Sequence, residues 1–262
     1  MRTICKYCNK KSIANLYEIK KTSNNQMVIA LAGNPNTGKS TIFNALTGLK
    51  QHTGNWPGKT VTNTQGFFKR KDKEFILVDL PGTYSLLANS IEEIVARDFI
   101  CFGNPDATIV VADATCLERN LNLLLQISEI TNNVILCVNL LDEAKRKNIY
   151  IDLNKLSNEL GIPVIGTIAR NKTGLEDLMD TVYKVCMREI IPNPKPILYP
   201  PKIEEKLQEL IPKIKPLVNN KFNPRWLALR ILEGDKNILD KIYTNNTCKG
   251  VCDNGKACSN RF

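Results

Sequence analysis

Residues 33–40 read GNPNTGKS and match the pattern GxxxxGK[ST] at every fixed position. An apolar run at 27–32 precedes them and a helix-like stretch begins at Ser40, which is the strand–loop–helix context that a phosphate loop requires. In such a loop, backbone N–H groups converge on anionic oxygens, and the following helix adds the positive end of its dipole. The pattern therefore predicts a nucleotide phosphate site formed by Gly33, Asn34, Pro35, Asn36, Thr37, Gly38, Lys39, Ser40 and Thr41.

Short apolar runs alternate with helix-like stretches between residues 27 and 187. The apolar runs are too continuous for half-exposed strands, which favours parallel strands covered on both faces. This predicts an α/β P-loop NTPase fold, with a Ras-like G domain whose mostly parallel sheet has helices on both faces. The expected strands are 27–32, 74–79, 108–113, 133–139 and 163–168, and the expected helices are 90–102 (opened by a Ser90–Glu93 capping box), 117–130, 151–161 and 174–186.

The chain divides into five parts. An N-terminal extension at 1–26 precedes the G domain at 27–187, a proline-rich linker at 188–200 leads to a small all-α domain at 201–244, and a tail occupies 245–262. In the helical domain, Pro212 and Pro216 are expected to bend or break the first helix. A second helix is better defined, because Asn223 and Pro224 suit its start and Gly234 its end.

Three further positions predict Mg²⁺-dependent phosphate chemistry. Lys39 would reach the terminal phosphates, and the Ser40 hydroxyl would bind Mg²⁺. Asp79 ends a strand in DLPG, where a carboxylate holds Mg²⁺ through water and the Gly82 backbone senses the last phosphate. Thr60 is the candidate switch residue that completes Mg²⁺ coordination, although it could also simply begin the strand that follows.

The tetrapeptide NLLD at 139–142 follows an apolar strand and predicts a guanine site. The Asp142 carboxylate would accept from the guanine N1–H and amine, and adenine has no such donor pair. Asn139 is the other fixed residue of the motif, and Leu140 replaces its common lysine. Ala169 and Arg170 follow the last strand, where a backbone N–H would meet the guanine oxygen. These residues predict GTP and GDP as ligands.

Several segments together resemble the ferrous-iron transport protein B (FeoB) family over roughly residues 27–240. They are GNPNTGKS, GNWPGKT, DLPGTYSL, VVADATCLERNL and RWLALRILEGD. The resemblance implies a G domain followed by a helical domain that stabilises bound GDP and couples the G domain to a membrane pore for Fe²⁺. Lys59 and Thr62 depart from the usual residues around the switch threonine, and the membrane pore itself is absent from this sequence.

The residue after the DLPG glycine is Thr83, where many GTP hydrolases carry a glutamine that orients the attacking water. The family resemblance implies that backbone groups around 56–58 position the water instead. It also implies a K⁺ ion that takes the role of an arginine finger, with Asn36 as its ligand, although Asn36 could also only brace the loop. The expected catalytic residues are thus Asn36, Lys39, Thr60 and Gly82.

The expected role is the GTP-hydrolysing cytoplasmic part of a Fe²⁺ transport system, at the inner face of the membrane. The pore would be a continuation of the chain or a separate subunit, and a homo-oligomer is left open. No run approaches the length of a membrane span, and no signal peptide is visible. One alternative is a free-standing regulatory GTPase. Another is an RNA-linked GTPase, which the net charge of +10 suggests, but no base-stacking segment supports nucleic acid as a partner.

Cysteines gather at both ends of the chain. Cys5 and Cys8 have metal-ligand spacing, and Cys248 and Cys252 offer further thiolates, with Cys258 nearby. Reduced, unliganded thiols are the leading interpretation. A Zn²⁺ site or an iron-sensing site that joins the two ends is the alternative.

Overall fold

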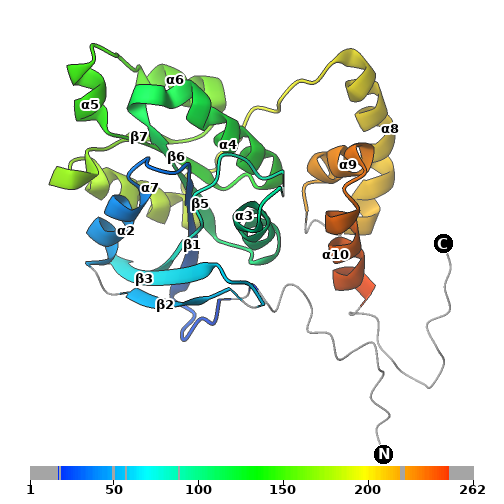
Figure 1. Ribbon diagram of the computed structural model, residues 1–262, viewed down its shortest axis with the longest axis horizontal. Helices are drawn as coiled ribbons and strands as arrows, with labels where there is room; N and C mark the ends of the chain where they lie inside the picture. Colours follow the sequence, from blue (N-terminus) through cyan, green and yellow to red (C-terminus); the bar gives the residue numbers. More distant parts are fainter. Residues whose placement is uncertain are drawn as a thin grey trace, which may run out of the picture.

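The structure is a computed structural model that describes residues 17, 19–48, 51–56, 58–87, 89–218 and 222–247. Its core is a seven-stranded sheet in the order β2-β3-β4-β1-β5-β6-β7 (Figure 1). Strands β4, β1, β5, β6 and β7 run parallel to one another. Strand β3 pairs antiparallel with β4, and β2 pairs antiparallel with β3 at that edge of the sheet. The bounds are β1 Gln26–Gly33, β2 Gln51–Asn55, β3 Thr62–Arg70, β4 Lys73–Asp79, β5 Ala107–Asp113, β6 Val134–Asn139 and β7 Val164–Gly166.

Helices cover both faces of this sheet, as the sequence predicts. Alternate residues of β1 point to opposite faces, so that Val28, Ala30 and Ala32 join one apolar cluster while Ile29 and Leu31 join the other. The first cluster includes α3 and α4, and the second includes α2 and α7. The bounds of the G-domain helices are α2 Lys39–Thr47, α3 Ile91–Phe102, α4 Leu117–Ile130, α5 Leu141–Arg146, α6 Leu153–Leu160 and α7 Leu175–Cys186, with short 3-10 turns at Ala114–Cys116 and Ala169–Asn171.

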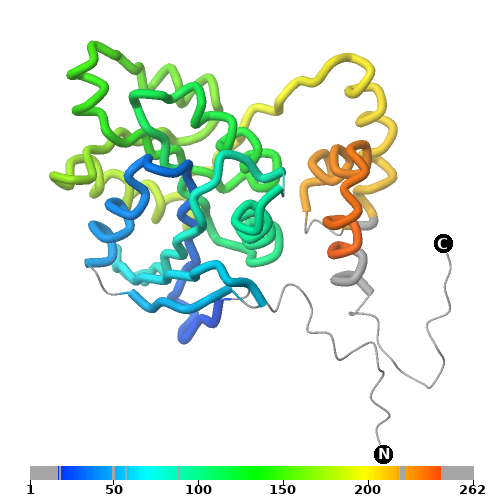
Figure 2. Tube along the Cα trace, in the orientation of Figure 1, coloured from blue at the N-terminus to red at the C-terminus, as the bar shows by residue number. Residues whose placement is uncertain are grey.

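An extended segment leads from the end of the G domain to three helices that pack beside α3 and α4 (Figure 2). These are α8 Pro201–Val218, α9 Pro224–Glu233 and α10 Lys236–Thr247. The packing is apolar, with the rings of Phe102 on α3 and Phe222 before α9 5.7 Å apart. Among the described residues, no helix is both long and apolar enough to cross a bilayer.

In the helical domain, the structure contradicts the expected break in the first helix and adds a helix that was not predicted. Helix α8 is not broken at Pro212 or Pro216, because both prolines lie on its exposed side while Leu207 and Ile214 remain buried. Water can satisfy the carbonyl groups that lose their donor on that side. Helix α10 was not predicted, since its polar sequence KNILDKIYTNNT gives only a weak apolar period, although Ile238 and Ile242 are buried. The expected start of α9 at Asn223 and its end at Gly234 are confirmed.

Candidate nucleotide site

The phosphate loop joins β1 to α2 at the carboxyl edge of the parallel strands, where ligands bind in sheets of this kind. At two positions of this loop only glycine fits, because a Cβ atom would collide with a neighbouring strand. Gly38 has φ 82°, and a Cβ there would lie 2.3 Å from Asn139 Nδ2. Gly33 passes close to β5, where a Cβ would lie 2.7 Å from the Val111 carbonyl oxygen. The loop is thus held tightly against the two neighbouring strands.

Lys39 and Asp79 meet at the centre of this edge. Lys39 begins α2, Asp79 ends β4, and the ammonium group donates a hydrogen bond to the carboxylate Oδ1. Both side chains are largely buried. Burial raises the pKa of Asp79 above its usual value, and the charge of Lys39 opposes that shift. The two groups that the sequence assigns to phosphate and to Mg²⁺ are therefore in direct contact.

An open pocket of about 390 Å³ lies beside this pair. Lys39, Asp79 and the candidate switch residue Thr60 all line it, so the structure brings these three predicted residues together. Glu92, in the first turn of α3, lines it as well. The sequence analysis missed Glu92, for which the only signal was its place in the helix that follows DLPG.

The oxygen donors around this pocket suit Mg²⁺, which prefers carboxylate and hydroxyl ligands. Ser40 lies next to Lys39 in the first turn of α2, Asp79 supplies a carboxylate, and Thr60 supplies an exposed hydroxyl. Asn36 is the residue expected to bind K⁺. It is exposed in the phosphate loop with φ 65°, and its amide oxygen is an acceptable ligand for a monovalent cation. The residues present therefore fit Mg²⁺, and the expectation that Asn36 binds K⁺ stays a prediction.

Asn139, at the end of β6, ties the base end of the site together. Its Nδ2 donates to the Thr37 carbonyl oxygen at 3.0 Å, and its Oδ1 accepts from the Thr167 hydroxyl at 3.0 Å and from the Ala169 N–H at 3.1 Å. The side chain is buried, so these contacts fix the phosphate loop relative to the segment after β7. The Ala169 N–H, which was expected to meet a guanine oxygen, donates to Asn139 in this network.

Asp142 lies in the first turn of α5, beside two arginines. Its Oδ2 is 3.7 Å from Arg146 and 3.8 Å from Arg170, and both arginine side chains are mostly exposed. Leu140 precedes it with φ 63°, a left-handed conformation that turns the chain from β6 into α5. The predicted base-reading carboxylate is thus partly solvated and free of any close, buried ion pair.

Thr83, which replaces the expected glutamine, points into the protein. Its side chain is buried, and its N–H donates to the Gly33 carbonyl oxygen at 3.3 Å. The next residue, Tyr84, is exposed, and its ring lies 4.5 Å from the Arg119 guanidinium carbon. The buried Thr83 side chain therefore cannot orient a water molecule at the phosphates.

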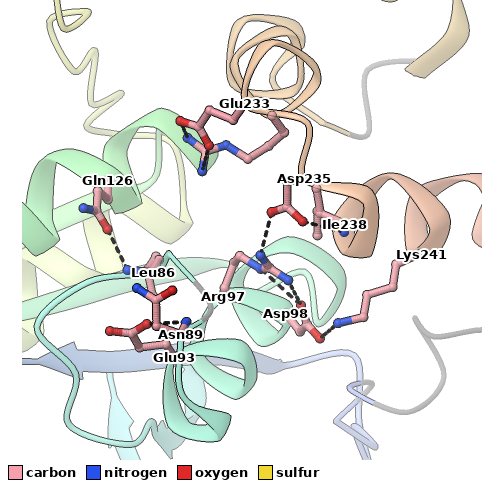
Figure 3. Close-up of polar contacts among 11 residues, drawn as sticks. Leu86, Asn89, Glu93, Arg97, Asp98, Gln126, Glu233, Asp235, Ile238 and Lys241 are labelled. Atoms are coloured by element: carbon pink, nitrogen blue, oxygen red, sulfur yellow. Dashed lines mark hydrogen bonds and ion pairs between the residues drawn. The ribbon is translucent and has the colours of Figure 1, made fainter.

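The loop from 83 to 90 is held by two side chains (Figure 3). The Glu93 carboxylate accepts from the Asn89 N–H at 2.9 Å, and Gln126 Oε1 accepts from the Leu86 N–H at 2.6 Å. The Glu93 carboxylate also accepts from the Ser85 hydroxyl at 2.7 Å. The predicted capping box is half formed, because Ser90 Oγ accepts from the Glu93 N–H at 3.1 Å while the Glu93 carboxylate bonds to the residue before the cap. Sequence analysis missed Gln126, which is one glutamine on a helix without a distinguishing pattern.

Helix α3 connects this loop to the helical domain (Figure 3). Arg97 donates to Asp235 at 3.0 Å and lies 3.4 Å from its neighbour Asp98, which also accepts from Lys241 of α10 at 2.6 Å. Arg97 and Asp98 are almost wholly buried. The charges of α3 are therefore matched by charges of the helical domain, and the two domains meet through paired groups.

The terminal cysteines Cys5, Cys8, Cys248 and Cys252 lie outside the described residues, so the hypothesis of a metal site there stays a prediction. Within the described ranges, no group of three or more His, Cys, Asp or Glu side chains could hold a metal ion. Four other cysteines are free: Cys101 and Cys137 are buried, Cys186 is partly buried, and Cys116 is exposed. Burial raises the pKa of Cys137 to about 12, which keeps that thiol protonated and inert.

Comparison with known proteins agrees with this architecture. A family model described as "Ferrous iron transport protein B" matches residues 27–182, and a second one, "FeoB cytosolic helical domain", matches 199–254. A curated relative, the Fe(2+) transporter FeoB of Shigella flexneri, is 41% identical over 217 residues, which cover 80% of this chain and 27% of that protein. The chain thus spans about a quarter of the length of the curated relatives it matches.

Solved structures agree as well. The cytosolic domain of the T. maritima FeoB iron transporter in apo form is 37% identical, with a TM-score of 0.75 over 88% of this chain and 89% of that chain. The cytosolic domain of L. pneumophila FeoB is 33% identical, with a TM-score of 0.76 over 84% of this chain and 87% of that chain. The fold of this chain is therefore similar to those of the two cytosolic domains over most of its length. The chain belongs to the ferrous iron transport protein B family, with its G domain and its cytosolic helical domain.

Proposed function

We propose that this chain binds GTP with Mg²⁺ and hydrolyses it to GDP, and that its nucleotide state regulates Fe²⁺ passage through a pore at the inner face of the membrane. The observation that carries the proposal is one open pocket lined by Lys39, Asp79 and Thr60, with Asp142 at the base end, in a chain of this family. The pore would be a later part of a longer chain or a separate subunit. The proposal leaves open both a single copy and a homo-oligomer of the chain.

Nucleotide binding would separate Lys39 from Asp79. The terminal phosphates would attract the Lys39 ammonium group, which would leave the Asp79 carboxylate and the hydroxyls of Ser40 and Thr60 available to hold Mg²⁺. When bound, Mg²⁺ neutralises the phosphate charge. The Lys39–Asp79 pair keeps the pocket polar and correctly arranged until a ligand replaces its internal contact.

Hydrolysis then needs a source of positive charge and a means of orienting water. Because Thr83 is buried, we assign water positioning to backbone groups around 56–58 and of Gly82. A bound K⁺ supplies the charge that an arginine finger provides elsewhere. Asn36 is its proposed ligand, since it lies exposed in the phosphate loop.

GTP turnover in potassium buffer against sodium buffer tests this mechanism. We expect potassium to accelerate hydrolysis in the wild type, and Asn36→Ala to abolish the difference. Asn104→Ala is the matched control, because Asn104 is also an exposed asparagine in a left-handed conformation, at φ 54°, but lies outside the pocket. Equal rates in both salts for the wild type would contradict the potassium role, and no turnover in either salt would contradict hydrolysis by this chain alone.

The link to iron needs a separate experiment. Residues 27–240 would replace the matching region of the Shigella flexneri transporter, and Fe²⁺ uptake by cells that depend on this chimera would be measured. Uptake that is lost in the Lys39→Ala chimera supports nucleotide-dependent regulation of a pore. Uptake that is unaffected by Lys39→Ala would favour a free-standing GTPase with another partner.

A further inference from the structure

Trp56 lies in the loop between β2 and β3, yet it is buried to 1% exposure. Its ring centroid is 5.2 Å from that of Phe99 on α3 and 5.6 Å from that of Tyr17. Aromatic pairs at these separations attract each other beyond the burial of their area. A loop residue is thus held between a helix of the G domain and a residue from the segment before β1.

Tyr17 precedes the region that the family model matches, which begins at residue 27. It is itself buried at 6% exposure, and its hydroxyl donates to Asp98 Oδ2 at 3.3 Å. Burial and the charge of Asp98 raise the pKa of Tyr17, so the hydroxyl keeps the proton that it donates. Tyr17 therefore covers Trp56 with its ring and is fixed to α3 through its hydroxyl.

The position of Trp56 sets the position of Thr60. The Trp56 N–H donates to the Val61 carbonyl oxygen at 2.9 Å, and the Lys59 N–H donates to the Trp56 carbonyl oxygen at 2.9 Å. These two bonds close a short loop that contains Thr60, which lines the phosphate pocket with Lys39. A displacement of Trp56 would move this whole loop away from the pocket.

The indole N–H of Trp56 has no hydrogen-bond partner among the residues that the structure describes. A buried N–H without a partner opposes burial, because the group could bond to water outside. The ring contacts of Tyr17 and Phe99 therefore supply the attraction that keeps Trp56 in place. Loss of one of them shifts the balance toward an open loop.

Asp98 links this cover to the helical domain. Its Oδ2 accepts both the Tyr17 hydroxyl, at 3.3 Å, and the Lys241 ammonium group of α10, at 2.6 Å. Both groups thus depend on one buried oxygen, and a change at either donor reaches the other through it.

We propose that Tyr17 is a positioning residue, which holds Trp56 against α3 so that Thr60 stays at the phosphate pocket, and which shares Asp98 with the helical domain. The inference rests on the proposed function, because Thr60 is taken to contact Mg²⁺ only when the third phosphate is present. It assigns a role to the segment before the G domain.

The test compares the affinities of the whole chain for GDP and for a non-hydrolysable GTP analogue, both fluorescent, in the presence of Mg²⁺. We expect Tyr17→Ala to raise the Kd for the analogue about three- to tenfold, the range that one aromatic pair corresponds to, and to leave the Kd for GDP within about twofold. Tyr17→Leu keeps apolar volume and guards against a variant that fails to fold. A merely structural role would weaken both ligands equally, and that result would overturn the inference.

Fluorine NMR of the chain labelled with 5-fluorotryptophan gives a second readout. The chain has two tryptophans, so Trp226 in α9 serves as an internal reference, and Trp56→Phe assigns the signals. Tyr17→Ala should move the Trp56 signal and leave that of Trp226 in place. A Trp56 signal that does not move would overturn the inference.

Tyr183→Phe is the matched control for Tyr17→Phe, because the Tyr183 hydroxyl also donates to a carboxylate, Asp72 Oδ1 at 3.0 Å, on another part of the G domain. Tyr17→Phe should raise the Kd of the analogue by about three- to tenfold, as the loss of one hydrogen bond to a carboxylate predicts, and Tyr183→Phe should change neither Kd. If Tyr17→Phe and Tyr183→Phe changed the Kd of the analogue equally, the role assigned to the Tyr17–Asp98 hydrogen bond would be overturned. A wild-type chain that binds neither nucleotide would instead overturn the proposed function itself.

Discussion

Two ends of the candidate nucleotide site are held in different ways: the base end around Asn139, and the switch end in the loop that follows Gly82. At the base end, the Asn139 side chain is buried and bonded on both its oxygen and its nitrogen to three other segments. At the switch end, the loop from 83 to 90 is held by the partly exposed contacts of Glu93 and Gln126. Buried, fully bonded groups resist local opening, whereas loops held by a few exposed bonds open at little cost.

This difference suits a protein that reads two features of one ligand. The base is the same before and after hydrolysis, so its site gains from a fixed arrangement. The third phosphate is lost, so the segments that sense it must have two positions of similar free energy. The buried charges of Arg97 and Asp98 give α3 a firm attachment to the helical domain.

The largest expected effect comes from that attachment. Arg97→Met should lower the free energy of unfolding by about 3–5 kcal/mol, because it leaves the buried Asp98 with less compensation and removes the pair with Asp235. Urea denaturation measures the change. Lys195→Met is the control, since Lys195 forms an exposed pair with Glu159 and should cost no more than about 0.5 kcal/mol. Similar values for both variants would show that α3 is not firmly attached.

Asn139→Ala should have the next largest effect, about 2–4 kcal/mol in the free energy of unfolding. It leaves the Thr37 carbonyl, the Thr167 hydroxyl and the Ala169 N–H without the partner that the side chain supplies. The same denaturation experiment measures it, with Asn104→Ala as an exposed control. A loss below about 1 kcal/mol would mean that the base end is not the rigid part of the site.

Asp142→Asn should affect ligand choice and leave stability nearly unchanged. We expect the affinity for GDP to fall about ten- to hundredfold, or about 1.4–2.7 kcal/mol, because a charged acceptor for two guanine donors is lost. The diphosphate of xanthosine should bind the variant better than the wild type, since an amide can donate to the oxygen that replaces the guanine amine. Calorimetric titration with both ligands measures this. Unchanged GDP affinity would place the base elsewhere.

The positions of the phosphate loop and of the NLLD segment in the fold were easier to predict from the sequence than the contacts of the loop after Gly82, for a physical reason. The fixed residues Gly38, Lys39 and Asp142 follow strands at set positions, so local pattern and sheet topology together bring them to one edge. The parallel sheet, its helices and the start of α9 were also predicted. The sequence could not predict contacts between distant segments, such as those of Tyr17 with Asp98 and of Gln126 with Leu86.

Strand β2 and helix α10 were missed because their stability comes from packing, and the short helix α5 was not predicted either. Strand β2, QHTGN, is exposed at every position and carries no apolar alternation, and it forms as an edge partner of β3. Helix α10 buries Ile238 and Ile242 and presents Lys241 to Asp98, which only the folded arrangement reveals. The domain boundaries and the roles of the site residues stay predictions.

The smallest expected effect tests the looseness of the switch end directly. Gln126→Leu removes the acceptor of the Leu86 N–H, so the loop should open more often while the core is unaffected. We expect hydrogen exchange at the Leu86 amide to become about five- to tenfold faster, as a loss of about 1 kcal/mol predicts, with global stability changed by no more than about 0.5 kcal/mol. Gln208→Leu, on the exposed side of α8, should leave that exchange rate unchanged. If Gln126→Leu left the exchange of Leu86 unchanged and lowered global stability instead, the loop would open only with the whole domain. The contrast between a rigid base end and a movable switch end would then be wrong.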